Sequence, residues 1–520
     1  MAAPTVPAQG PSTDTTQRVP GDMLLGLVPL AAIAVLVLND HLLKAAWPGA
    51  LTGKLSDVAG LVFFPFVLVG MWQLGGPRLG RPAAGGFISA VVAICATGIV
   101  FALVKTTTGA GDLYRGGLAL LQWPFAAVAS VLVGDPVPAI GRVALVADPS
   151  DLVALPALAV PLGIAILARP PDATAWHRWR GLAVSVLACG MLVGAVVDGW
   201  AHTHLPAALE TVLTPWHAVV YTSFALLVAV FVGEAATTAR THPAPPPPRT
   251  VSSEMSRASS LIAPGYGPTV IGAIIFAIAG LADTTWHVAF GLEADAEALV
   301  SPTHLLLGVG AALIAVGPAR SAWRARVPVR WPEFLPVALA VGTIIGLVGF
   351  ATHIASPYVD AWPSYPYDAA SSTFWPIAPL GIAAVGLQSV IVASGIVSVL
   401  RLWPGAPVGA LAVVILVGVG PLTFLHDEVR LLVGPLAGGL AAELLAATGR
   451  ARRWSDVRLV RTVAAVTPAA MWIGVVVALA ATGAVAWSAH LLGGALVVAV
   501  SMGGLIGALA TLPAPSAPAD

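Results

Sequence analysis

Apolar stretches of about 20 residues recur along the whole chain and decide what it can fold into. A helix of about 20 apolar residues crosses the hydrocarbon core of a bilayer. Only 10% of the 520 residues are charged, against about 25% in soluble domains. We therefore predict an all-α protein, a polytopic transmembrane helical bundle of about 14 spans in contact with lipid. The expected spans are 23–39, 58–74, 84–104, 151–168, 181–202, 214–233, 268–289, 302–318, 334–354, 376–400, 407–425, 430–447, 463–484 and 488–510. The weaker run 116–134, broken by the sequence QWP, is either a fifteenth span or a re-entrant piece.

Charge and cysteine content exclude several classes. The formal net charge is zero, which gives no reason to expect a nucleic-acid partner. The two cysteines, Cys95 and Cys189, each lie inside an apolar run. This placement argues against a disulfide framework and against a cysteine metal cluster.

The remaining composition divides the chain into segments. We expect a disordered tail over 1–22 and an N-terminal transmembrane domain over 23–170. Two helical hairpins follow at 181–234 and 268–320, joined by a Pro-rich cytoplasmic linker at 235–267. A C-terminal transmembrane bundle covers 334–510, and a short tail covers 511–520.

Arginine placement predicts the orientation in a cell membrane. From residue 181 onward, arginines cluster in alternate loops, and the loops between them carry only Arg430. The positive-inside rule puts the Arg-rich loops and both termini in the cytoplasm. On this topology, seven of the 11 histidines fall at the outer ends of their spans: His202, His217, His287, His304, His353, His426 and His490.

Two hairpins share one pattern of polar residues. Asp198 and His202 are four residues apart, as are Asp283 and His287. Downstream, ETVLTPWH at 210–217 and EALVSPTH at 297–304 both read E-x-x-[LV]-[ST]-P-x-H. A repeated helix pair with the same orientation predicts a parallel internal duplication.

The spacing predicts two metal-ligand sets. Residues four apart share a helix face, and Thr214 or Ser301 is a suitable N-cap before a proline at the first helical position. The short hairpin then brings His217 or His304 to the preceding Asp/His pair. One carboxylate and two imidazoles suit a divalent metal, namely copper, zinc or iron. Further predicted ligands or acceptors are Glu210, Glu297 and His353. The alternative is a hydrogen-bonded Asp–His cluster that only ties each hairpin together.

This pattern resembles the metal site in the membrane-embedded C subunit of the particulate methane and ammonia monooxygenases. The matching residues are Asp283, His287 and His304, and likewise Asp198, His202 and His217. The match covers these hairpins alone, and the last spacing is longer here than in that family. The resemblance implies a copper-type site.

Several alternatives stay open at this point. The metal centre can serve a membrane oxidoreductase or hydrolase, with an external metal donor or redox partner. A metal or ion transporter and a non-enzymatic scaffold or sensor are the other classes, and paired histidines can also ligate haem. The three acidic residues at 293–297 predict tighter metal binding at the downstream hairpin. In the N-terminal domain, a polar cluster predicts an ion-paired network; its members are Asn39, Asp40, His41, Lys44, Lys54, Asp57, Lys105, Asp112, Asp148 and Asp151.

Overall fold

The protein is an all-helical membrane protein in the computed structural model. The structure describes residues 22–75, 86–133, 135–143, 145–168, 173–205, 214–241, 262–290, 300–326, 329–366 and 374–513. These residues contain no β-strand. Within them, 13 helices are long and apolar enough to cross a membrane, and two shorter apolar helices cover Leu335–Ala351 and Ala410–Phe424. Each of the 14 spans expected from the sequence therefore corresponds to a helix, which confirms a polytopic helical bundle. The chain forms two compact units, residues 1–169 and 170–520.

The first unit is a group of helices around α3. Its α3 packs against α1, α4 and the 3-10 helix η4, and a small apolar cluster includes Val69, Ala93 and Ala165. The elements are η1 (Asp22–Leu25), α1 (Leu27–Leu38), the π-helical turn η2 (Asn39–Leu43), α2 (Lys44–Ala46), α3 (Ala50–Gly75), α4 (Phe87–Thr106), α5 (Thr108–Val133), η4 (Pro149–Leu158) and α6 (Ala159–Ala168).

An ion-paired network joins three elements of this unit. Lys105, at the end of α4, lies 2.7 Å from Asp151 in η4 and 3.1 Å from Asp57 in α3. Lys54 lies 2.9 Å from Asp151. The predicted network is thus present, and each carboxylate has a cationic partner, as charges in an apolar setting require.

The same network shows where the segment containing the weak run 116–134 begins and ends within this unit. Because Lys105 and Asp151 touch, the end of α4 and the start of η4 lie at one side of the unit. The intervening chain leaves with α5 and returns along it, since Trp123 Nε1 donates to the Pro138 carbonyl (2.8 Å) and Arg115 to the Leu145 carbonyl (2.6 Å). Helix α5 is long and apolar enough to cross a membrane, and the segment from Thr107 to Asp148 begins and ends at the same side of this unit.

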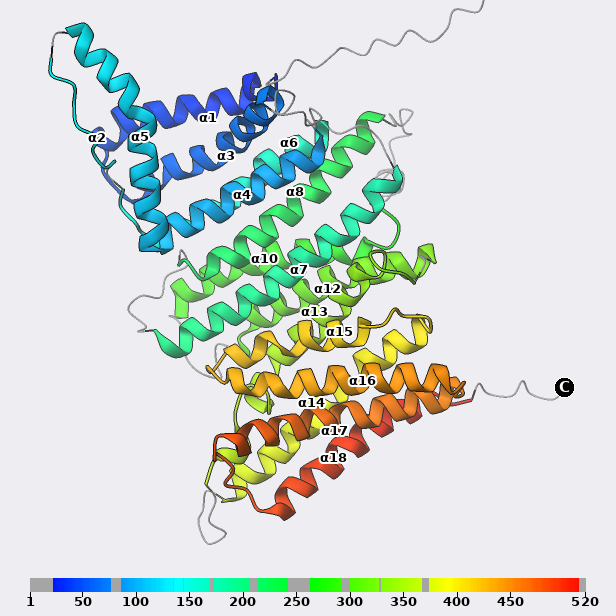
Figure 1. The fold of residues 1–520 in the computed structure, drawn as a ribbon. Helices are drawn as coiled ribbons and strands as arrows, with labels where there is room; N and C mark the ends of the chain where they lie inside the picture. The colour runs from blue at the N-terminus through cyan, green and yellow to red at the C-terminus, as the bar shows by residue number, and fades with distance from the viewer. Residues whose placement is uncertain are drawn as a thin grey trace, which may run out of the picture. The chain divides into compact units, whose positions relative to one another are not determined.

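The second unit is a row of packed helices (Figure 1). Along it, α8 packs on α7, α13 on both α7 and α12, and α15 on α13, followed by α16, α17 and α18, with α14 against α17 and α18. The elements are α7 (Ala173–His204), α8 (His217–Thr241), α10 (Gly267–Phe290), α12 (Pro302–Ala325), α13 (Leu335–Ala351), η6 (His353–Ala355), η7 (Trp362–Ser364), α14 (Phe374–Leu402), α15 (Ala410–Val419), η8 (Pro421–Phe424), η9 (Val429–Leu432), α16 (Val433–Ala451), α17 (Asp456–Ala481) and α18 (Ala489–Leu509).

Helices α7, α8, α10 and α12 form one core of their own, built from residues such as Met191, Leu227 and Ile314. Small residues allow these helices to approach closely. A Cβ added at Gly272 of α10 would lie 2.5 Å from the Gly310 carbonyl oxygen of α12. A glycine at each side of a crossing lets two backbones touch, which is how membrane helices associate without a hydrophobic driving force.

A buried charge pair joins these four helices at the ends where α7 begins and α8 finishes. Arg180 of α7 pairs with Glu234 of α8. Its guanidinium also lies 4.7 Å from the ring centroid of Tyr266, which precedes α10. All three side chains are buried, so the contact connects three segments of the group.

Candidate metal centre

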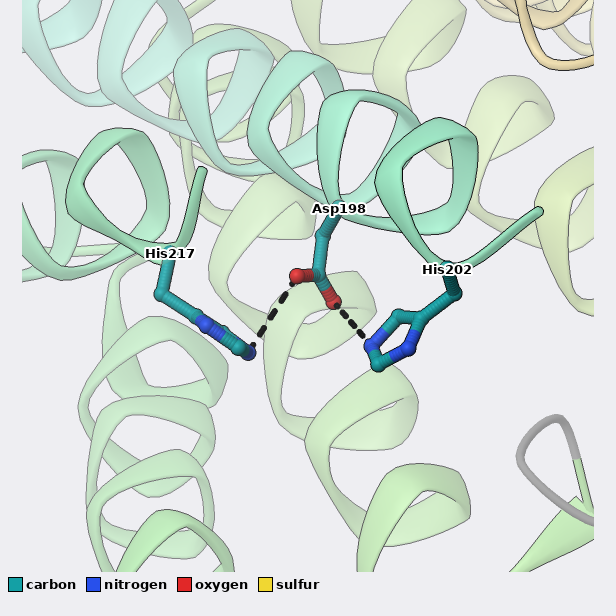
Figure 2. A group of neighbouring side chains, drawn as sticks. All are labelled: Asp198, His202 and His217. Carbon is teal, nitrogen blue, oxygen red and sulfur yellow. Dashed lines mark ion pairs between the residues drawn. The ribbon is translucent and has the colours of Figure 1, made fainter. Parts of the chain in front are cut away.

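The first Asp–His–His group lies where α7 ends and α8 begins. Asp198 and His202 occupy successive turns of α7, and Asp198 Oδ2 lies 3.6 Å from His202 Nε2. The other oxygen, Oδ1, lies 3.2 Å from Nε2 of His217, the first residue of α8. Figure 2 shows the carboxylate between the two imidazoles. The hairpin therefore brings together the three side chains predicted from the spacing.

The second group repeats this arrangement at the end of α10 and the start of α12. Asp283 Oδ2 lies 3.3 Å from His287 Nε2, and Asp283 Oδ1 lies 3.4 Å from His304 Nε2. The ring centroids of the two histidines are 5.8 Å apart, compared with 6.4 Å between His202 and His217. In each group, one carboxylate thus meets two imidazoles through their Nε2 atoms.

The hydroxyl of the [ST]-P-x-H sequence orients the last histidine. Ser301 is the N-cap of α12, as predicted, and its Oγ accepts from the His304 backbone N–H. The same hydroxyl lies 2.9 Å from His304 Nδ1. In the first hairpin, Thr214 Oγ1 hydrogen-bonds His217 Nδ1, although α8 begins at His217 after a turn rather than at Pro215. A hydrogen bond at Nδ1 fixes the ring and leaves Nε2 directed at the carboxylate.

Both groups fit a metal ion by geometry and donor type. In each, one ligand atom from each of the three residues lies within 4.8 Å of the others. Asp198 Oδ1 is buried yet has no hydrogen-bond partner among the described residues, although His217 Nε2 is 3.2 Å away. A buried carboxylate oxygen without a donor is costly, and a bound cation would satisfy it. Two imidazoles and a carboxylate leave open positions for water or a substrate.

A contact between α8 and α10 connects the helices that carry the two groups. Phe224 of α8 packs on Phe276 of α10, with ring centroids 4.8 Å apart. Seven residues return a helix to nearly the same face, about 10 Å further along. Helix α8 starts, and α10 ends, at the end of the unit that carries the histidines. His217 lies seven residues before Phe224, and Asp283 lies seven residues after Phe276, so both are the same distance along their helices from this contact.

The charges agree with this juxtaposition. His217 interacts electrostatically with Asp283 and His304 of the other group as well as with its own aspartate. Tyr221 stacks on His217, with ring centroids 5.6 Å apart, and is within electrostatic range of both aspartates. The two groups are therefore neighbours, and both aspartates act electrostatically on Tyr221.

Two residues of this region were not predicted from the sequence. Thr303 Oγ1 donates a 2.6 Å hydrogen bond to Asp283 Oδ1, which orients the second carboxylate. The sequence signal for Thr303 was its place between the proline and histidine of SPTH. Tyr221, four residues after His217, carries no such signal.

Three further ligands or acceptors were predicted, namely Glu210, Glu297 and His353. Glu210 and Glu297 are outside the described residues. His353 follows α13 and lies beside His426, with ring centroids 6.2 Å apart. Burial lowers the pKa of His353, whereas the hydrogen bond from His426 to Asp360 raises the pKa of His426.

A further contact ties α7 to the segment that carries His426. Trp200 Nε1 donates to Asp427 Oδ1 (2.9 Å), and His204 Nε2 lies 3.1 Å from Asp427 Oδ2. Asp427 adopts a left-handed backbone conformation with φ of 59°, which is uncommon outside glycine.

Comparison of the chain with protein-family models, curated proteins and solved structures found no match. The likeness to the monooxygenase C subunits therefore rests on the hairpin residues alone.

Proposed function

We propose that this protein is an integral membrane metal-binding protein that holds divalent metal at the outer face of a cell membrane. One observation carries the proposal. In each of two hairpins, the Nε2 atoms of two histidines approach the carboxylate of one aspartate, and a hydroxyl group contacts Nδ1 of the last histidine. An imidazole whose second nitrogen is held by a hydrogen bond is the usual arrangement of a metal-ligating histidine. An Asp–His cluster that only ties the hairpin together does not need the ring held at both nitrogens.

We further propose a copper-type oxidoreductase. A site with two imidazoles and one carboxylate suits Cu(II), Zn(II) or Fe(II), and the resemblance to the monooxygenase C subunits favours copper. A bound metal of this kind would supply one-electron redox chemistry or polarise a coordinated oxygen atom. The residues of this chain would hold it: Asp198 and Asp283 would provide charge, and the histidines would provide neutral nitrogen donors. Such a function requires a redox partner or metal donor at the same face.

The described interior does not favour a transporter. Intramembrane transport sites place polar groups near the middle of the bundle. In the middle of α13 and α14, Thr343 donates to the Leu339 carbonyl and Ser389 to the Val385 carbonyl of its own helix. Such back-bonding satisfies the hydroxyl groups locally. Buried Gln388 donates to Thr352 Oγ1 and to the Ala355 carbonyl, beyond the end of α13.

Metal analysis of the purified full-length protein tests the proposal. We expect bound copper, zinc or iron after expression with all three metals available, and a loss of metal from one site in each of the four variants His202→Ala, His217→Ala, His287→Ala and His304→Ala. His490→Ala is the matched control, because His490 starts α18 outside both groups. Because three acidic residues lie at 293–297, the group of Asp283, His287 and His304 should retain its metal at a lower free metal concentration than the first group. Wild-type protein without metal would support the scaffold instead.

A further inference from the structure

Two histidines outside the Asp–His–His groups approach each other at the same end of the second unit. His353 begins the 3-10 turn η6 after α13, and His426 lies in the turn between η8 and η9. They are 73 positions apart in the chain, yet their ring centroids are 6.2 Å apart and their planes are nearly perpendicular, at 88°. Both side chains are partly exposed.

Each ring is held in the tautomer that a metal ligand needs. His353 Nδ1 lies 2.8 Å from the Phe350 carbonyl oxygen, and His426 Nδ1 lies 2.8 Å from Asp360 Oδ1. Both oxygens are acceptors, so each Nδ1 carries the proton and donates. Metal-ligating histidines usually donate this other N–H to a backbone carbonyl or a carboxylate. His353 donates to a backbone carbonyl and His426 to a carboxylate.

The remaining nitrogen of each ring is available. Within the part of the chain that the structure describes, neither His353 Nε2 nor His426 Nε2 has a hydrogen-bond partner. In a neutral imidazole with a protonated Nδ1, Nε2 is a lone-pair donor. The pair therefore presents two neutral nitrogen donors at one place.

The separation matches what a shared metal ion requires. A metal about 2 Å from each Nε2 allows the ring centroids to be about 6 Å apart. The observed 6.2 Å also lies between the 5.8 Å and 6.4 Å of the histidine pairs in the two Asp–His–His groups.

The pair adjoins the first Asp–His–His group through α7. A Cβ at Gly199 would lie 2.9 Å from Leu425 and 3.2 Å from Phe350. Leu425 directly precedes His426, and Phe350 is three residues before His353. Gly199 itself follows Asp198. The two-histidine pair and the first group therefore flank the same turn of α7.

We propose that His353 and His426 form an additional metal site with two imidazole ligands, distinct from the two Asp–His–His groups. It takes a metal that favours imidazole, such as copper or zinc. With two protein ligands instead of three and no carboxylate between the rings, it binds at least about tenfold more weakly than those groups. A weak site beside a tighter one can pass metal on, so this pair is suited to deliver metal to the first Asp–His–His group.

Titration of the metal-free, full-length protein with Cu(II) and, separately, Zn(II) tests this proposal. The wild-type protein is expected to bind one more equivalent than the Asp–His–His groups account for, with weaker affinity. His353→Ala and His426→Ala should each remove this weak equivalent and the corresponding nitrogen couplings in the electron paramagnetic resonance spectrum. His490→Ala should retain it.

A second variant separates ligand loss from misfolding. His353→Gln keeps an N–H that can donate to the Phe350 carbonyl but has no nitrogen lone pair, so it should fold and still lose the weak equivalent. An unchanged stoichiometry and spectrum in His353→Gln and His426→Ala would overturn the proposal. Its failure differs from failure of the proposed function, which would appear as absence of the tight equivalents that depend on His217 and His304.

Discussion

Substitution of Gly272 by alanine should damage the second Asp–His–His group from a distance. The new Cβ would lie 2.5 Å from the Gly310 carbonyl oxygen, 2.7 Å from Leu313 Cβ and 2.8 Å from the Ile314 nitrogen. Two of these atoms are backbone, so side-chain rotation cannot relieve the contact. An ordinary contact begins near 3.4 Å, so α10 and α12 must separate by about 0.9 Å at this crossing, at a cost of about 1–3 kcal/mol.

The separation should reach the metal ligands. Helix α10 carries Asp283 and His287, and α12 carries His304. Metal–ligand distances tolerate about 0.2 Å of error, so a shift of this size between the two helices misplaces His304 relative to the other ligands. We expect metal affinity at the second group to fall at least about tenfold, with the first group unchanged.

The control lies in the same helix. Gly280 has nothing within 4 Å of a new Cβ, so Gly280→Ala should be neutral or stabilising by up to about 1 kcal/mol through helix propensity. Unfolding of both variants in micelles gives the stability difference, and competition with a chelator gives the metal affinity. If Gly272→Ala matches Gly280→Ala in both measurements, the close crossing does not set the ligand geometry.

Three further outcomes are expected. Ser301→Ala removes the hydroxyl beside His304 Nδ1 and should lower metal affinity at the second group about 10–100-fold in a chelator competition. The control Thr285→Ala loses only a hydrogen bond to its own helix and should keep the wild-type affinity. Equal affinities in the two variants would contradict the orienting role of Ser301. Lys105→Met leaves two carboxylates in the first unit without this cation and should destabilise the protein by about 3–5 kcal/mol, measured by unfolding in micelles; a stability equal to wild type would show that the network is dispensable. Reporter fusions at Pro246 and at the C-terminus should both read as cytoplasmic, and an external signal at either would refute the arginine-based topology.

Regular features of the chain were predictable because each depends on residues close in sequence. Apolar length alone identifies a membrane helix, and the four-residue spacing of Asp283 and His287 places both on one face. The N-cap at Ser301 followed from SPTH in the same way. These local rules predicted all three members of each Asp–His–His group.

Features that depend on helix packing were not predictable. Nothing local indicates that Phe224 meets Phe276, and this contact brings the two groups together. Likewise, nothing local indicates that His353, predicted as a further ligand, lies beside His426. The placement of the two ends of the segment containing the run 116–134 needed the contact between Lys105 and Asp151, which join distant parts of the chain.

The buried pair of Arg180 and Glu234 has a consequence for how the protein responds to lipid. It fastens α7 to α8 far along both helices from Asp198 and His217, which meet at the opposite ends of the same two helices. Helices fixed to each other at two separated points cannot slide lengthwise. When bilayer thickness differs from their hydrophobic length, membrane helices adapt by tilting, and here the pair must tilt as one rigid body. Ligand distances in the first group should therefore stay constant across bilayers of different thickness.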